Sequence, residues 1–112
     1  MAIDITRDEG SMRDGTYKLH FFYPVASLNE YQRYWEKAIA ETDVKLFKEN
    51  SKFETKDLKQ VMDELGRLFV WAKINLSGTD LINMTWRLEN LLIVIPKACE
   101  APNAHDRPFE IY

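Results

Sequence analysis

The chain has 112 residues, of which 46% are hydrophobic and 29% are charged. This composition is typical of a soluble globular domain and excludes a wholly disordered chain. Its net charge of -3 makes nucleic acid a poor partner, because the overall field repels a phosphate backbone. We expect one domain spanning residues 1–112, since this length buries a core without disulfides or metal.

The compartment is predicted from the cysteine content, the N-terminus and the apolar runs. Cys99 is the single cysteine and cannot form an intramolecular disulfide, which fits a reducing environment. The first ten residues carry no cationic region followed by an apolar stretch, so they do not read as a secretory signal. The longest apolar run, residues 91–95, is far too short to span a membrane. We therefore expect a soluble cytoplasmic protein with no membrane partner.

The N-terminal part predicts extended structure. Ile3 and Ile5 alternate with polar residues, which allows a brief first strand, and residues 1–16 are expected to be partly flexible, with a loop over residues 8–16. Residues 17–23 alternate aromatic or aliphatic side chains with a period of two, the pattern of a strand. Pro24 is expected to end this strand.

A first helix is expected after Pro24. Ser27 and Glu30 have the spacing of a capping box, in which each side chain bonds the other residue's backbone N–H. No glycine or proline follows before Asn50, so we expect the helix to continue past Leu46 and to turn at residues 50–52. Its apolar stripe comprises Leu28, Tyr31, Trp35, Ala38, Ile39, Thr42 and Leu46.

The central helix is expected over residues 57–76, preceded by a second capping box at Ser51 and Glu54. Gly66 interrupts it, at a cost of about 1 kcal/mol relative to alanine. A helix ending before Gly66, with residues 69–76 as a strand, is the alternative. The unbroken stripe favours the continuous helix. That stripe comprises Leu58, Val61, Met62, Leu65, Leu68, Phe69 and Ala72.

A third helix is expected from Thr79 or Asp80 to Ile95, where Pro96 should end or kink it. Residues 109–112 are expected to form a short strand beside residues 17–23. The predicted fold is therefore mainly α, a three-helix antiparallel core with these two strands paired. The alternative is an α+β fold with residues 69–76 as a strand.

The search for catalytic chemistry is mostly negative. His20 and His105 do not form a zinc-binding spacing, and no glycine-rich phosphate loop is present. Paired carboxylates on the helices lack the Glu-x-x-His element of di-metal bundles. We expect no enzyme, no cofactor and no metal. The alternative is a small enzyme in which His105 and Asp106, with His20 or Tyr112, act as acid and base.

Several aromatic side chains lie off the apolar stripes, and such residues often anchor protein interfaces. Small acidic domains of this format resemble inhibitors and bacterial immunity proteins or antitoxins, whose carboxylates meet basic nuclease toxins. A non-enzymatic inhibitor of another protein, with a basic toxin domain as partner, is the leading hypothesis. The alternative is a homodimer or other homo-oligomeric structural or accessory subunit, in which the off-stripe aromatics, Trp86 among them, bury against a second copy. The expected partner-binding residues are Tyr34, Glu36, Glu41, Asp57, Asp63, Glu64 and Trp71.

Overall fold

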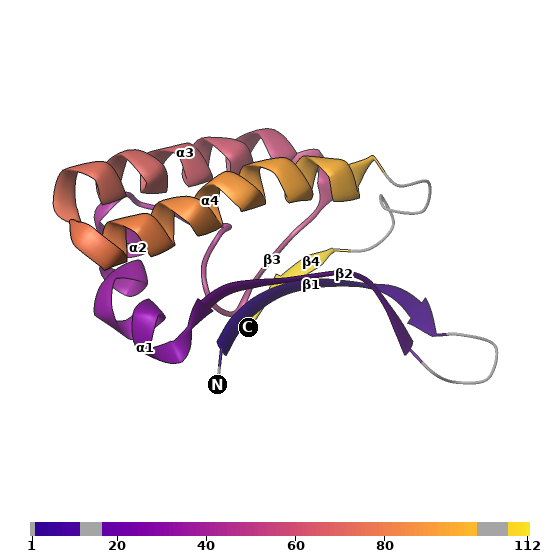
Figure 1. Cartoon of the computed structure of the whole chain (residues 1–112). Helices are drawn as coiled ribbons and strands as arrows, with labels where there is room; N and C mark the ends of the chain where they lie inside the picture. The colour runs from indigo at the N-terminus through magenta and orange to yellow at the C-terminus, as the bar shows by residue number, and fades with distance from the viewer. Residues whose placement is uncertain (1, 12–16, 101–107) are drawn as a thin grey trace.

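The computed structural model describes residues 2–11, 17–100 and 108–112. In this part of the chain, four strands form one antiparallel sheet in the order β2-β1-β4-β3. Two long helices, α3 and α4, lie side by side over one face of this sheet (Figure 1). The fold is mixed α+β, which agrees with the alternative class more than with the mainly α class. The three helical regions of the prediction are present.

The N-terminal strand is longer than expected. β1 (Ala2–Ser11) pairs with β2 (Tyr17–Ser27), and residues 12–16 of the segment expected to be flexible lie outside the described residues. Pro24 does not end β2, contrary to the prediction. It lies opposite Asp4, next to a register shift in an edge strand, where a missing N–H is tolerated.

The C-terminal strand is present, but its neighbours differ from those predicted. β4 (Phe109–Ile111) lies between β1 and β3 (Ser51–Phe53) rather than beside residues 17–23. The rings of Phe53 and Phe109 stack with their centroids 4.8 Å apart. The neighbour of β4 is therefore β1, whereas the sequence predicted residues 17–23, which belong to β2.

The first helical region starts as predicted and ends early. The N–H of Glu30 donates to Ser27 Oγ, and the N–H of Ser27 donates to Glu30 Oε1, each at 3.1 Å. α1 (Leu28–Glu30), a π-helical turn η1 (Tyr31–Trp35) and α2 (Glu36–Glu41) follow one another without a break. Asp43 has a φ of 56°, a left-handed conformation that no helix continues through, so the helix ends before Leu46.

The second predicted capping box is displaced by one turn, because Ser51 belongs to β3. Glu54 and Asp57 form it instead, with the Glu54 N–H donating to Asp57 Oδ2 at 2.9 Å. A 3-10 turn, η2 (Thr55–Asp57), then leads into α3 (Leu58–Asn75). α3 runs through Gly66, so the continuous helix is confirmed and the strand over residues 69–76 is wrong.

The last helix, α4 (Gly78–Cys99), extends past Pro96, where an end or a kink was predicted. Only residues 97–99 follow Pro96 in the helix, so the missing N–H affects just its last turn. Four apolar side chains of α3 and four of α4 are completely buried. These are Val61, Leu65, Leu68 and Ala72 of α3 and Met84, Leu88, Leu91 and Ile95 of α4.

Candidate functional site

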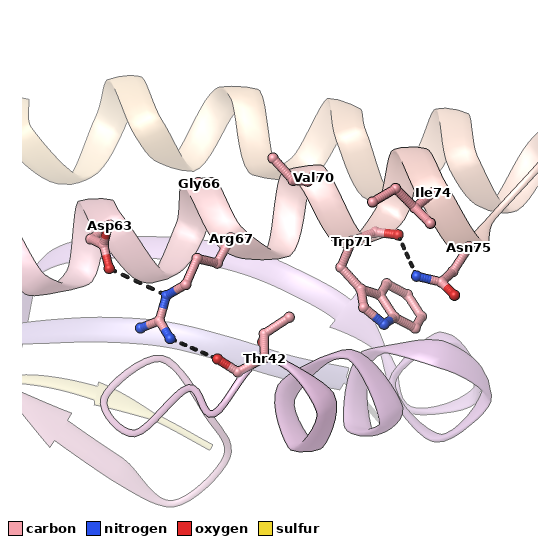
Figure 2. A pocket seen from close by; sticks show the side chains of 8 residues that line it. All are labelled: Thr42, Asp63, Gly66, Arg67, Val70, Trp71, Ile74 and Asn75. Atoms are coloured by element: carbon pink, nitrogen blue, oxygen red, sulfur yellow. Dashed lines mark hydrogen bonds and ion pairs between the residues drawn. The ribbon is translucent and has the colours of Figure 1, made fainter.

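A surface pocket with a volume of about 410 Å³ opens on the flank of α3, beside the end of α2. We call it the α3 pocket. In Figure 2, Arg67 and Trp71 point from α3 toward Thr42, whereas Val70 and Ile74 point away from it. The residues that line it are Thr42, Asp63, Gly66, Arg67, Val70, Trp71, Ile74 and Asn75.

The lining is mostly apolar. Val70 is 57% exposed and Ile74 is 76% exposed. These values are high for large aliphatic residues on a helix that otherwise buries its apolar face. Trp71 is only 7% exposed, and its indole Nε1–H donates to Glu41 Oε1 at 3.2 Å. That hydrogen bond fixes the ring as a wall of the pocket.

The polar rim is held by Arg67. Its Nη1 donates to the backbone carbonyl oxygen of Thr42 at 2.7 Å, and its Nε lies 3.2 Å from Asp63 Oδ2. These contacts connect α3 to the residue that follows α2. The Arg67 guanidinium therefore holds the two sides of the pocket, α3 and Thr42, in a fixed position relative to each other.

Gly66 lies in the lining and has no structural requirement to be glycine. An added Cβ would meet nothing within 4 Å, and the positive φ that demands glycine occurs at Gly78 instead. A helix-interior glycine costs about 1 kcal/mol relative to alanine. Because a side chain here would enter the α3 pocket, the glycine keeps that space open at a cost in helix stability.

The predicted partner-binding residues are only partly brought together. Asp63 and Trp71 line the pocket, and Glu41 adjoins it through the Trp71 indole. Asp57 lies in the 3-10 turn before α3, where its carboxylate accepts the Glu54 N–H, and Glu36 is exposed on α2 outside the pocket.

Two of the predicted contact residues have side chains that are buried within the chain, which differs from the expected surface position. Tyr34 is 3% exposed, and its hydroxyl donates to Glu30 Oε2 at 3.0 Å. Burial and this hydrogen bond raise the pKa of Tyr34, so its hydroxyl remains protonated and keeps donating at neutral pH. Glu64 is 0% exposed.

The Glu64 carboxylate is a structural acceptor. It accepts the backbone N–H groups of Phe47 at 2.9 Å, Leu46 at 3.0 Å and Lys45 at 3.3 Å, and the amide of Gln60 at 3.1 Å. It thereby holds the loop that follows α2 against α3.

Sequence reasoning missed most of the lining. Val70 and Ile74 are four residues apart and lie off the apolar stripe of the central helix, a signal that was present in the sequence. Gly66 was read as a possible helix end rather than as an open position. Arg67, Asn75 and Thr42 carry no sequence pattern that marks a site.

The residues considered for catalysis add no site in the described part of the chain. No group of three histidine, cysteine or acidic residues comes together there in a way that could hold a metal ion. His105, Asp106 and the side chain of His20 lie outside the described residues. Cys99 is a free, half-buried thiol at the end of α4.

Comparison of the chain with protein-family models, with curated proteins and with solved structures finds no match. Among the described residues, no helix combines the length and apolar character needed to cross a membrane.

Proposed function

We propose that the protein is a non-enzymatic inhibitor that binds another protein and occludes part of its surface, with the α3 pocket as its contact. The observation that carries this proposal is Gly66. Its lack of a side chain leaves open a pocket lined by the exposed aliphatic residues Val70 and Ile74, although alanine would favour the helix.

The chemistry of the pocket suits one apolar side chain of a partner protein. Its volume of about 410 Å³ is within the range of ligand sites, and a polar rim surrounds the apolar lining, as it does at the energetic centres of protein interfaces. Val70 and Ile74 remain more than half exposed, so one side is open. A small ligand would be poorly enclosed there, whereas a protein surface would cover the opening.

Charge supports a partner with a basic surface. The carboxylates of Asp63 and Glu41 border the pocket, where they pair with Arg67 and Lys37, and their side chains are still 70% and 45% exposed. The net charge of -3 adds a weak attraction toward a cationic protein. A bacterial immunity protein or antitoxin that neutralises a nuclease toxin is the class of inhibitor that we propose.

The partner is best identified by crosslinking from the pocket itself. A photoreactive phenylalanine analogue placed at Val70 should crosslink the partner in cells of the source organism. The same analogue at Phe22, which is 55% exposed on β2 away from α3, is the matched control. The captured protein is identified by mass spectrometry and purified for the assays.

The decisive assay is inhibition by the purified protein. We expect the captured protein to be a nuclease whose activity falls on addition of the wild-type chain and is restored when Ile74→Asp replaces it. A captured protein that keeps its full activity in the presence of saturating wild-type chain would contradict the inhibitor role.

A further inference from the structure

The outward face of α4 carries an apolar stripe that nothing in the described structure covers. Ile82, Trp86 and Ile93 are 67%, 54% and 65% exposed. At 100° per residue they point in one direction, opposite to the completely buried Met84, Leu88 and Leu91. This stripe is distinct from the α3 pocket, which lies where α3 meets the end of α2.

The spacing of the stripe is symmetric about its centre. Glu89 is exposed and lies on the same face, between Trp86 and Ile93. The midpoint between Ile82 and Ile93 falls between residues 87 and 88, and the midpoint between Trp86 and Glu89 falls at the same place. A two-fold axis through that point places position 82 of one antiparallel α4 helix opposite position 93 of the other, and position 86 opposite position 89.

We propose that a second copy of this chain covers the outward face of α4, forming an antiparallel dimer about this axis. Each Ile82 then packs against Ile93 of the other copy, and each Trp86 faces Glu89 of the other copy. The symmetric spacing allows a second copy to use every position of the stripe twice.

Charge complementarity supports the same pairing. The guanidinium carbon of Arg87 lies 5.0 Å from the centre of the Trp86 ring, so a positive charge sits beside each indole. Glu89 of the other copy brings a carboxylate to this position, next to the Arg87 cation and the indole N–H donor. The Arg87 guanidinium, whose Nη1 also donates to the carbonyl oxygen of Pro24 at 3.3 Å, thus meets an opposite charge from the other copy.

The size of the stripe predicts the strength of the dimer. Three large side chains on one helix cover less than the roughly 800 Å² per partner of a typical stable complex. We therefore expect a dissociation constant in the micromolar range, measured by sedimentation equilibrium as a concentration-dependent rise above the monomer mass of 13.2 kDa.

Opposite charges test the register of the pairing. Ile82→Glu and Ile93→Lys should each weaken self-association at least about tenfold, because each places unpaired charges in the apolar contact. Mixing the two variants should restore association, since Glu at position 82 of one chain meets Lys at position 93 of the other. Phe22→Glu, on the sheet, is the matched control and should dimerise like the wild type.

Circular dichroism melts check that each variant folds, and we expect melts like that of the wild type because the substitutions are at exposed positions. A wild-type chain that stays monomeric up to about 1 mM would overturn the dimer. A dimer that both charge variants leave intact would overturn the α4 interface. A mixture that associates no better than either variant alone would overturn the antiparallel pairing.

Discussion

Glu64 shows how a charged residue can be part of the interior. Its two carboxylate oxygens accept three backbone N–H groups from residues 45–47 and one side-chain amide, so the charge is balanced by donors rather than by a cation. The loop after α2 has no helix or strand partner of its own at these residues. Its backbone groups are satisfied by this side chain instead.

Replacing Glu64 with glutamine should lower the free energy of unfolding by about 2 to 4 kcal/mol, because an amide presents N–H donors to the backbone donors of the loop. Urea denaturation monitored by circular dichroism measures the change. The matched control is Glu36→Gln, at an exposed position, which should stay within about 0.5 kcal/mol of the wild type. Equal stabilities of the two variants would show that the loop does not depend on Glu64.

The pKa of Glu30 determines how this residue's contribution to the stability of the protein depends on pH. Partial burial raises the pKa of the Glu30 carboxyl, but hydrogen bonds from Ser27 and Tyr34 outweigh burial and hold this pKa below its ordinary value of 4.5. A carboxyl with a lowered pKa in the folded state stabilises the protein above the unfolded-state pKa. That contribution is lost as the pH falls through the folded-state pKa.

We therefore expect Glu30→Gln to be less stable than the wild type at pH 7 and to come closer to the wild-type stability at pH 3, because the Glu30 carboxyl gains its proton as the pH falls. The measurement is urea denaturation of both proteins at the two pH values. A stability difference that is the same at both pH values would refute a role for the ionised carboxylate.

At the scale of the element, α3 contains a glycine that its backbone does not need. Gly66→Ala should raise the free energy of unfolding by about 0.5 to 1 kcal/mol, because alanine favours the helix and its Cβ meets open space. Gly78→Ala is the matched control. Its φ of 59° strains any side chain, so it should lower stability by about 1 kcal/mol or more. Thermal unfolding of the two variants should shift in opposite directions.

Local sequence patterns were sufficient to place the three helical regions, but not all of their ends. The Ser27–Glu30 spacing placed the start of the first helix, and the stripe through Gly66 predicted the continuous α3. The end of the first helix was missed, because no glycine or proline marks Asp43, whose left-handed φ stops it. Glu64 and Tyr34 were placed on the surface because their side chains are polar. Their burial depends on hydrogen-bond partners: the Phe47 N–H, from a distant part of the chain, for Glu64, and the Glu30 carboxylate, one helical turn earlier, for Tyr34.

At the scale of the whole molecule, the order of the strands could not be predicted locally. β4 lies between β1 and β3, so the two ends of the chain pair with each other, and the N–H of Asp4 donates to the carbonyl oxygen of Tyr112 at 2.8 Å. The sequence indicated strands at both ends, but the pairing predicted from it, residues 109–112 beside residues 17–23, differs from the observed one. The apolar pocket likewise arises only when α3 and the end of α2 come together.

The position of β4 makes Phe109 a key residue of the fold. It is 0% exposed, stacks on Phe53 and lies under the Arg7 guanidinium, whose carbon is 4.6 Å from the ring centre. Phe109→Ala should lower the free energy of unfolding by about 3 to 5 kcal/mol in urea denaturation. Phe22→Ala, at a 55% exposed position, should cost less than about 1 kcal/mol. Similar losses in the two variants would contradict a closed core between β3 and β4.

The central claim is that the α3 pocket binds a partner protein, and Gly66→Leu tests it most directly. Leucine is a good helix former and its Cβ meets open space, so this variant should fold at least as stably as the wild type while filling the pocket. Isothermal titration calorimetry with the protein captured from Val70 gives the two affinities. We predict that Gly66→Leu binds at least about thirtyfold more weakly, the loss expected when a central anchor is excluded. Equal affinities of Gly66→Leu and the wild type would contradict the claim.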